Sequence, residues 1–509
     1  ISDATLFFKA LKLNSEDQKI AKRIIDEINS RLSYLKDVGL GYLTMERASN
    51  SLSGGESQRI NLATSIGSSL VGSMYILDEP SIGLHPRDSL RLIEVLKKLR
   101  DVGNSVIVVE HDEEMMKSAD MIIDIGPYAG RHGGEVVFKG NHSELVKASK
   151  SLTAKYLTGQ YKIEVPKVRR KPKDFIIIEQ AYLHNLQNIT VKIPLNQICV
   201  VTGVSGSGKS TLIGKILHTF LERFFLTGLH KASHCNDIKM NFDLVSGVEY
   251  INQNPIGKSS RSNPITYTKG YDDIRQLFAS EKHAKAKGFK PGYFSFNVDG
   301  GRCEKCQGEG QLTISMQFMA DVHLKCDECN GKRFKEEVLE VKFKGKNISQ
   351  VLEMTVEESL DFFNEDNTLC KKIKSKIFAL SEVGLEYVQL GQASNTLSGG
   401  EAQRIKLASF LSHNKSKQKK LFIFDEPTTG LHFHDVKKLI KALQDLVEMG
   451  HHVVIIEHHM DIIKSADWIV DLGPEGGDKG GDLVFEGSPE SFVKSKVLSP
   501  TKDHLKGYI

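Results

Sequence analysis

The sequence predicts an α/β protein that contains two copies of one nucleotide-binding unit, the first of them incomplete. The pentapeptide Leu-Ser-Gly-Gly-Glu occurs at residues 52–56 and again at residues 397–401, and each occurrence precedes an apolar run that ends in Asp-Glu-Pro. One glycine-rich loop, residues 203–210, follows an apolar run and precedes a stretch typical of a helix. A strand, a glycine loop and a helix in that order favour a parallel α/β sheet that binds phosphate groups.

A long internal repeat organises the chain. The segment from Val38 matches the segment from Val383, and the Asp-Glu-Pro motif from Asp78 matches the one from Asp425 at a slightly larger offset. The extra residues fall in the polar stretch 415–420, where an insertion costs little. This period is far too long for a solenoid. It therefore indicates two copies of a whole domain, which we call copy one and copy two.

The same spacing locates the phosphate-binding loop that copy one lacks. In copy two, Lys209 precedes Ser398 by a fixed number of residues. Counting the same number back from Ser53 in copy one reaches a position before Ile1. We therefore expect that loop to lie outside the sequence, which begins without a Met and has the character of a fragment. We assign residues 1–150 to the C-terminal part of copy one, 151–174 to a Lys/Arg/Pro-rich linker, 175–509 to copy two and 290–340 to a metal-binding module inserted in copy two.

The composition is that of a globular protein of two or three domains. Charged residues make up 26% of the 509 positions and hydrophobic residues 40%, and there is no apolar run long enough to span a membrane. The first residues lack the blocks of a signal peptide, so we expect a cytoplasmic protein. A net charge of +4 is too small to identify a nucleic-acid partner. The basic runs 167–173 and 415–420 are most simply a solvated linker and loop.

The glycine loop predicts how the nucleotide is held. Its glycines let backbone N–H groups approach the phosphates, and the helix that follows adds a favourable partial charge. We expect Lys209 to reach the β- and γ-phosphates and Ser210 to bind Mg²⁺. The predicted ATP-binding residues of the loop are Gly203, Val204, Ser205, Gly206, Ser207, Gly208, Lys209, Ser210 and Thr211.

Carboxylates follow two apolar strands, residues 74–78 and 421–425. We expect Asp425 to hold Mg²⁺, directly or through water. Glu426, beside it, is placed to polarise the attacking water as a general base. A carboxylate at a strand end is usually a solvated turn residue, but this acidic pair recurs in both copies, which favours a catalytic role. The counterparts in copy one are Asp78 and Glu79.

A histidine follows each acidic pair at the same distance. The separation between Glu426 and His458 in copy two equals that between Glu79 and His111 in copy one. A single histidine after a strand is normally structural, whereas repetition at one spacing favours a γ-phosphate sensor or a group that orients the water. Gln253 is predicted to contact Mg²⁺ or water, on the weaker support of a single copy.

Four cysteines predict a zinc site. Two Cys-x-x-Cys pairs, Cys303/Cys306 and Cys326/Cys329, follow one another closely in the chain, with a spacing that is typical of tetrahedral Zn²⁺ and fits a structural site better than a redox dithiol. Basic residues crowd the same stretch and could contact DNA phosphates without reading sequence, although a merely solvated basic surface remains the alternative. They are Arg302, Lys305, Lys325, Lys332 and Arg333.

Together these motifs resemble the ABC ATPases, a resemblance that implies helical signature subdomains. In that family ATP is sandwiched between the phosphate loop of one unit and the Leu-Ser-Gly-Gly signature of the other. Carried over, this implies one complete site, in which Lys209, Asp425, Glu426 and His458 face Ser53, Gly54, Gly55 and Glu56. It implies a second site, without its phosphate loop here, that contains Ser398, Gly399, Gly400, Asp78, Glu79 and His111.

A narrower resemblance is to the UvrA family, the DNA-damage-recognition subunits of the bacterial nucleotide-excision-repair excinuclease. It rests on residues 52–60, the Asp-Glu-Pro-x-x-Gly-Leu-His motifs at 78–85 and 425–432, the stretch 252–264 and the cysteine module. It covers essentially the whole chain and places it in the C-terminal portion of that family. It implies ATP, Mg²⁺ and Zn²⁺, damaged double-stranded DNA, a homodimer, and a UvrB-like helicase partner bound through a region absent from this chain.

Other functional classes fit the motifs less well. A transporter subunit is disfavoured because such motor domains do not normally carry an inserted zinc module, and tandem translation ATPases lack that module too. A UvrA-like paralogue with a non-repair role such as drug tolerance stays open, because the segments that would discriminate it are not in the sequence.

Overall fold

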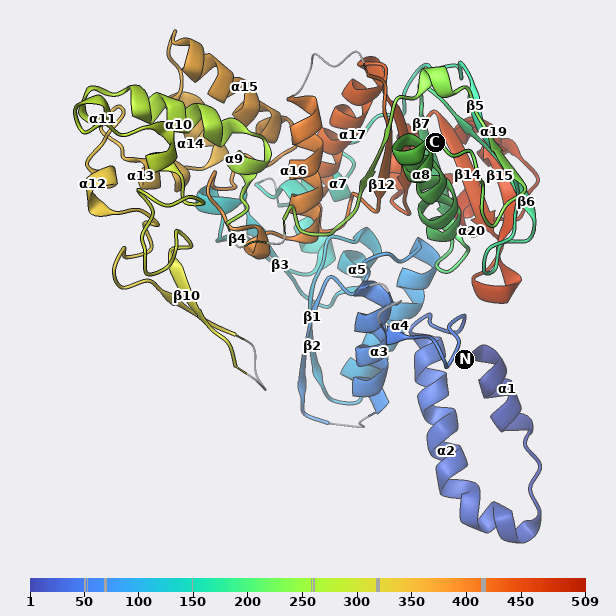
Figure 1. Ribbon diagram of the computed structural model, residues 1–509. Coiled ribbons are helices and arrows are strands. Elements are labelled where there is room, and N and C mark those ends of the chain that lie inside the picture. Colours follow the sequence, from blue (N-terminus) through green and yellow to red (C-terminus); the bar gives the residue numbers. More distant parts are fainter. Residues whose placement is uncertain are drawn as a thin grey trace. The chain divides into compact units, whose positions relative to one another are not determined.

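The computed structural model of the chain describes residues 1–49, 52, 54–67, 71–148, 150–257, 259, 261–316, 321–412 and 418–509 (Figure 1). Contacts divide the chain into two compact units. The first comprises Ile1–Pro127, Glu135–Tyr250 and Lys417–Ile509, and the second comprises Tyr128–Gly134 and Ile251–Ser416. The first compact unit therefore holds most of copy one together with the phosphate loop and the acidic pair of copy two. Among the described residues, no helix combines the length and the apolar character needed to cross a membrane.

The centre of copy two is a six-stranded sheet whose middle carries the phosphate loop. Strand β7 (Ile198–Gly203) lies between β13 (His452–Ile456) and β14 (Trp468–Gly473) and runs parallel to both. Every residue of β7 and β13 is buried, as expected for a parallel sheet covered on both faces. The order across the sheet is β15 (Asp482–Gly487), β14, β7, β13, β12 (Leu421–Asp425) and β9 (Val248–Ile251).

Helices and a small antiparallel sheet cover this sheet. The phosphate loop leads into a π-type helix (Thr211–His218) that continues as α8 (Thr219–Thr227). Its buried side chains share one hydrophobic core with those of β7, β12, β13 and β14. The other elements are α17 (Phe433–Glu448), α18 (Met460–Ser465), α19 (Pro489–Lys494), α20 (Pro500–Leu505), and the three strands β6 (Ile189–Pro194), β5 (Phe175–Ala181) and β8 (Asp237–Lys239).

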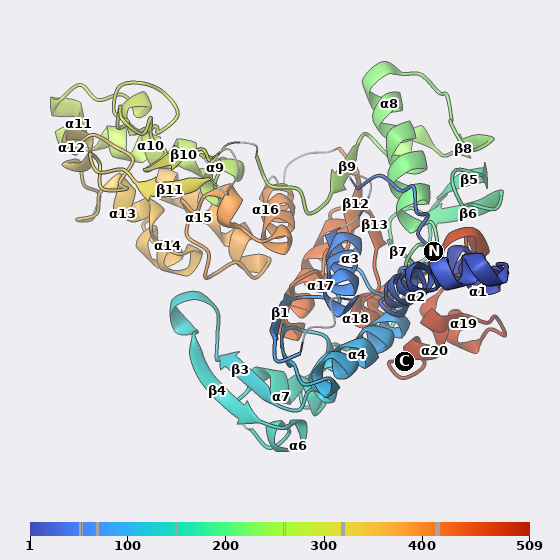
Figure 2. The same ribbon diagram turned by 90° about the horizontal axis from the view of Figure 1, so that it is seen from below.

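Copy one lacks, among its described residues, the strand that carries the phosphate loop in copy two. Its strands form two separate pairs, β1 (Met74–Asp78) with β2 (Ser105–Val109) and β3 (Ile122–Gly126) with β4 (Glu135–Gly140). In copy two, β7 lies between the counterparts of β2 and β3, and no described strand does so in copy one. Figure 2 shows β3 and β4 beside α7. The helices are α1 (Ser2–Ala10), α2 (Ser15–Asp37), α3 (Gly54–Gly67), α4 (Pro86–Asp101), α5 (Glu113–Ser118), α6 (His142–Leu145) and α7 (Leu152–Leu157). Helix α7 falls in the stretch 151–174 that was predicted to be a linker, and the hydrogen bonds of Ser151 and Thr153 to Asp124 extend copy one past residue 150.

Side-chain exposure supports this difference between the copies. Ile107 of β2 is 47% exposed and Ile125 of β3 is 66% exposed. Their counterparts in copy two, Val454 and Leu472, are 0% and 1% exposed in the core around β7. Within the described residues, the strands of copy one thus lack the apolar cover that β7 gives to those of copy two.

The second compact unit is mainly helical, as the resemblance predicted for the signature subdomain of copy two. Helix α16 (Gly399–Leu411), which begins in the second signature, packs against α15 (Thr368–Glu382), and α15 packs against α10 (Gly270–Ser280) and α14 (Val356–Phe362). An antiparallel hairpin, β10 (Gln311–Ile314) with β11 (Val322–Lys325), belongs to the cysteine module. The short helices are α9 (Pro264–Tyr267), α11 (Lys282–Ala286), α12 (Glu336–Leu339) and α13 (Ile348–Leu352).

Candidate functional site

The phosphate loop leaves β7 at a point where only glycine fits. Gly203 has φ +130°, and a Cβ there would lie 1.9 Å from the carbonyl oxygen of Leu472. The ammonium group of Lys209 lies inside the loop, where Nζ donates to the carbonyl oxygens of Gly203 at 3.0 Å and Val204 at 2.9 Å. Burial lowers the pKa of Lys209, and nearby carboxylates, that of Glu426 first, partly oppose this effect. The loop therefore surrounds a buried cation with backbone.

Buried polar atoms near the loop indicate what it can hold. Within the described part of the chain, Ser207 Oγ and both ring nitrogens of His458 are buried and have no hydrogen-bond partner. Unpaired buried polar groups are costly and rare, and phosphate oxygens can pair with them. The residues thus fit a nucleoside triphosphate. The remaining predicted loop residues, Ser205, Gly206, Gly208, Ser210 and Thr211, lie in the same loop and at the start of the helix that follows.

The acidic pair of copy two lies at the end of β12. Asp425 accepts a hydrogen bond from Tyr250 Oη at 2.8 Å. Burial raises the pKa of Asp425, and burial followed by the charges of Asp425 and Glu457 raises the pKa of Glu426. The backbone of Glu426 has φ +48°, and Glu79, its counterpart in copy one, has φ +44°. A left-handed backbone is costly for a residue other than glycine and recurs at functional sites, so both copies aim this carboxylate in the same strained way.

A second glutamate, which the sequence alone did not single out, connects His458 to the loop after the acidic pair. Glu457 accepts from the backbone N–H of His458 at 2.6 Å and from that of Thr428 at 3.0 Å. In copy one, Glu110 accepts in the same way from His111 at 2.9 Å and from a residue of the corresponding loop. The recurrence of Glu457 and Glu110 at the offset between the copies is a signal that could have identified them.

Copy one reaches the phosphate loop of copy two through the segment that follows its acidic pair. Ser205 Oγ donates to the carbonyl oxygen of Gly83 at 3.2 Å, and a Cβ built on Gly83 would lie 2.9 Å from Glu426 Oε2. From the signature side, the ring of Tyr42 lies against Gly206, and Tyr42 Oη donates to Glu56 at 2.6 Å. The loop around Lys209 is therefore approached by copy one from two segments.

The structure thus brings Lys209, Glu426 and His458 together with copy one. Of the predicted signature residues of copy one, Gly55 and Glu56 lie in the first turn of α3, where a Cβ on Gly55 would lie 2.5 Å from the Ile82 carbonyl oxygen. Gly54 begins that helix, and Ser53 lies outside the described residues.

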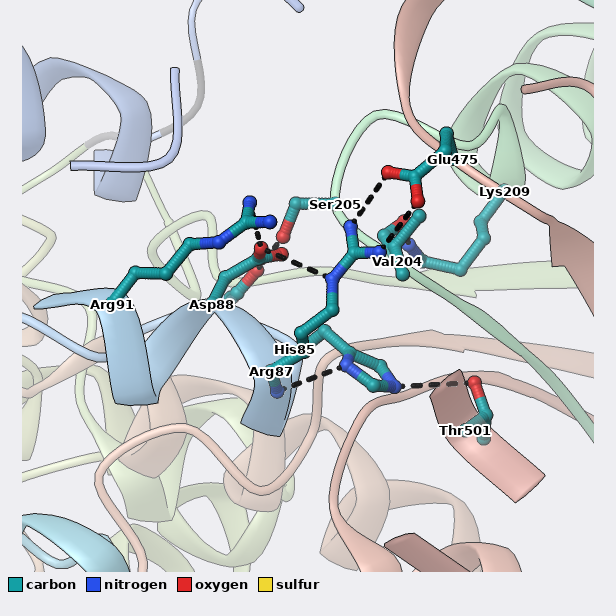
Figure 3. A network of polar contacts seen from close by, with 10 residues as sticks. His85, Arg87, Asp88, Arg91, Val204, Ser205, Lys209, Glu475 and Thr501 are labelled. Carbon is teal, nitrogen blue, oxygen red and sulfur yellow. Dashed lines mark hydrogen bonds and ion pairs between the residues drawn. The ribbon is translucent and has the colours of Figure 1, made fainter. Parts of the chain in front are cut away.

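A network of polar contacts surrounds this approach (Figure 3). Arg87, at the start of α4, donates to both carboxylate oxygens of Glu475 at 2.9 and 3.0 Å. His85 lies below it and is fully buried, with its Nε2 atom 3.2 Å from Thr501 Oγ1. Copy one is therefore joined to copy two near Lys209 both by the Arg87–Glu475 pair and by the contact of His85 with Thr501.

The acidic residues and the histidine predicted for the second site occupy positions in copy one that correspond to those of Asp425, Glu426 and His458 in copy two. A Cβ on Gly430 of copy two would lie 3.0 Å from Glu79 Oε1, just as one on Gly83 would approach Glu426. His111 Nε2 lies 4.0 Å from the same oxygen of Glu79, and Asp78 ends β1. Asp78, Glu79 and His111 therefore repeat the arrangement of the acidic pair and the histidine beside Lys209.

The second signature lies in the second compact unit, whereas Asp78, Glu79 and His111 lie in the first. Ser398 caps α16 through a reciprocal pair of hydrogen bonds with Glu401. Gly399 follows it, and a Cβ there would lie 3.2 Å from the Cβ of Gln253. Gln253, predicted to contact Mg²⁺, thus belongs with Gly399 and Gly400 in the second compact unit.

The four predicted cysteines converge. Their sulfur atoms all lie within 4.8 Å of one another, and the closest pairs are Cys306 with Cys329 at 3.7 Å and Cys303 with Cys326 at 3.9 Å. Thiolates that bind Zn²⁺ tetrahedrally at about 2.3 Å lie about 3.8 Å apart. The donor set and its spacing therefore fit one structural zinc ion.

The basic residues around the cysteines differ in their surroundings. Arg333 donates to the Gly391 carbonyl oxygen at 3.1 Å and lies over a phenylalanine ring, and Arg302 pairs with Asp299 at 2.7 Å. The lysines are exposed, and one of them, Lys305, pairs with Asp327 at 2.7 Å; the other two are Lys325 and Lys332. The arginines thus have partners within the protein, and the lysines form the exposed basic surface.

A phosphate loop that leaves a central strand between two parallel neighbours, Leu-Ser-Gly-Gly signatures that begin helices, and duplicated acidic pairs define the class of ABC ATPases. No protein-family model matches the chain. Among solved structures, UvrA2 from Deinococcus radiodurans superimposes with a TM-score of 0.90 at 39% identity, over 99% of this chain and 61% of that one. A ribosome-bound archaeal Pelota–ABCE1 structure, with a TM-score of 0.50 and 17% identity, shares the fold alone.

Within that class, the chain is similar to UvrABC system protein A over nearly its own whole length. It is 53% identical to that protein from Clostridium perfringens over 510 aligned residues, which are 99% of this chain and 53% of the relative. It is 52% identical to the protein from Staphylococcus epidermidis at the same coverages. The chain thus spans about half the length of the curated relatives it matches.

Proposed function

We propose that this chain is the ATP-hydrolysing, DNA-binding portion of a UvrA-type subunit that recognises damaged DNA in nucleotide excision repair. The observation that carries this proposal is the approach of copy one to the phosphate loop, where Gly83 meets both Ser205 and Glu426. A nucleotide bound by Lys209 is then enclosed by parts of both copies. ATP binding and hydrolysis consequently depend on how the copies meet.

In the proposed reaction, water attacks the γ-phosphorus of ATP to give ADP and phosphate. Lys209 and the loop N–H groups hold the phosphates, and the signature turn at Gly54–Gly55 approaches them with the N-terminus of α3. Glu426 accepts the proton of the attacking water, a role for which its raised pKa suits it. Burial lowers the pKa of His458 well below the usual range, so it acts as a neutral hydrogen-bond donor that orients the water or the γ-phosphate.

Mg²⁺ would be held by Ser210 and Asp425, with Gln253 as a further predicted contact, and would supply the charge that stabilises the leaving phosphate groups. Tyr250, which hydrogen-bonds Asp425, holds that carboxylate in place. Asp78, Glu79 and His111 of copy one are proposed to repeat these roles at the second site.

DNA is proposed to contact the exposed lysines of the cysteine module, namely Lys305, Lys325 and Lys332. The hairpin β10–β11 emerges from the four cysteines, and every residue of β11 is exposed. Zinc would hold the base of this hairpin rigid. Lysine contacts to phosphates position a protein on DNA without reading sequence, as a damage sensor requires.

The wider assembly is a further part of the proposal. It includes a homodimer in the cytoplasm and a UvrB-like helicase subunit as partner, and the likeness to UvrABC system protein A supports both. A UvrA-like paralogue with a non-repair role such as drug tolerance is the second candidate. Identities of 52–53% to relatives named UvrABC system protein A support the repair role.

Two measurements test the proposal. Lys209→Ala should reduce ATP turnover by this chain at least about 100-fold, because a buried phosphate-binding charge is lost, whereas the exposed Lys192→Ala should leave it unchanged. Turnover that survives Lys209→Ala would rule out the site. A duplex with one bulky adduct should bind more tightly than the same duplex without it, and equal affinities would favour the non-repair paralogue.

A further inference from the structure

A serine and a threonine near the end of each copy bind a buried aspartate in the same way. Ser499 Oγ donates to Asp471 Oδ2 at 2.6 Å, and Thr501 Oγ1 donates to Asp471 Oδ1 at 3.1 Å. In copy one the corresponding pair, Ser151 and Thr153, donates to Asp124 at the same two distances. The motif is thus duplicated in geometry as well as in sequence.

Each threonine also meets a histidine from the other copy. Thr501 of copy two lies 3.2 Å from Nε2 of His85, which copy one supplies, as Figure 3 shows. Thr153 of copy one lies 3.2 Å from Nε2 of His432, which copy two supplies. We call the first set (Asp471, Ser499, Thr501, His85) the His85 relay and the second set (Asp124, Ser151, Thr153, His432) the His432 relay.

The hydrogen bonds of each relay have only one possible direction. His85 Nδ1 accepts from the backbone N–H of Arg87 at 3.2 Å, so in the neutral ring the proton is on Nε2. Nε2 then donates to Thr501, and the Thr501 hydroxyl is left to donate to Asp471. His432 Nδ1 accepts from the N–H of His434 at 3.2 Å in the same way. A hydroxyl that both accepts and donates is therefore essential to each relay.

The His85 relay lies beside the catalytic groups of the Lys209 site. Asp471 is on β14, opposite Thr202 of the strand that carries the phosphate loop. The ring of His85 packs edge-on against that of His458, with centroids 5.9 Å apart and planes at 82°. His85 and Thr501 are 0% exposed and Asp471 is 1% exposed, so no water competes for these bonds. The ring of His432 likewise lies 6.4 Å from that of His111.

We propose that Thr501 is a positioning residue for ATP hydrolysis: it holds His85 of copy one against His458, so that His458 is aimed only when the copies are docked. Thr153 serves His111 in the same way. Since each copy gives one histidine and receives one, the two relays join the copies reciprocally. The inference rests on the proposed ATP hydrolysis at Lys209, and it assigns a role to Thr501 and Thr153, which lie outside the motifs found in the sequence.

The test compares Thr501→Val, which keeps the shape and removes the hydroxyl, with Thr501→Ser, which keeps the hydroxyl. Thr501→Val should lower kcat about tenfold, because the buried His85 N–H loses its acceptor, while the affinity for ATP changes less than about twofold. Thr501→Ser should restore most of the turnover. Thr268→Val is the matched control, because Thr268 is equally buried but bonds only to nearby carbonyls of its own segment; its kcat should equal that of the wild type.

A second readout separates this inference from the proposed function. In long-range ¹H–¹⁵N spectra of the ¹⁵N-histidine-labelled chain, His85 should be protonated at Nε2, and Thr501→Val should shift the His458 signals as well as those of His85. If the wild type fails to hydrolyse ATP, the proposed function fails and these spectra decide the relay. Unchanged kcat and unchanged His458 signals in Thr501→Val would overturn the inference, as would a loss of kcat that Thr501→Ser does not restore.

Discussion

Gly83 brings copy one close to Glu426, the proposed catalytic base of copy two, and Gly83→Ala should therefore slow ATP hydrolysis. The added Cβ would lie 2.9 Å from Glu426 Oε2, whereas ordinary contacts begin at 3.4 Å, so the carboxylate must move by about 0.5 Å. A misplacement of about 1 Å in an active site costs roughly 100-fold in rate. Half of that displacement predicts a loss of about tenfold in kcat.

The backbone of Gly83 has φ +65°, so alanine also introduces strain of about 1–2 kcal/mol. Gly228 provides the control, because it has φ +72° and nothing within 4 Å of its would-be Cβ. Gly228→Ala should show a similar loss of thermal stability with wild-type kcat. Steady-state ATP turnover and melting curves of both variants check this. The reasoning is refuted if Gly83→Ala retains wild-type kcat, or if both variants slow the reaction equally.

Three further predictions concern the base, the metal and DNA. Because the pKa of Glu426 is raised, its base form is lost as pH falls, and the acid limb of the kcat/KM profile should lie above the usual glutamate range; a limb within that range contradicts the assignment. Metal analysis should find about one zinc per chain, and Cys329→Ser should lower it; a zinc-free folded protein refutes the site. DNA affinity should fall by about 0.9 log units per log unit of salt for each phosphate neutralised. The double variant Lys325→Ala/Lys332→Ala should reduce that slope by about two, and an unchanged slope would argue against DNA contacts by the hairpin.

Local motifs were predictable from the sequence because their chemistry requires fixed residue types at fixed spacing. Lys209 and the four cysteines are of this kind, and the structure places the cysteine sulfurs within 4.8 Å of one another. The acidic pairs were predictable because they recur at one offset. For Lys209 and the cysteines, neighbours along the chain carry most of the information, whereas for the acidic pairs the internal repeat carries it.

Contacts between distant segments were not predictable in the same way. Tyr250 hydrogen-bonds Asp425 across 175 residues of chain, and His85 meets Thr501 across 416 residues. No spacing rule links such partners, because the fold alone brings them together. Local composition also did not predict the surroundings of Arg333. In the sequence it resembles part of a basic surface, but in the structure its guanidinium group packs over the ring of Phe296.

The two approaches between the copies are alike in their relays but differ in one ion pair. Arg87 and Glu475 join the copies beside Lys209, whereas His434 and Tyr128 stand at the corresponding positions of the other approach. The side chains of Arg87 and Glu475 are 23% and 49% exposed, so water screens the pair and it contributes about 1 kcal/mol at most. That corresponds to roughly a fivefold shift in the population of the docked arrangement. Because salt weakens such a pair but not the buried relays, docking around Lys209 has a salt-sensitive component that the carboxylate–guanidinium pair supplies.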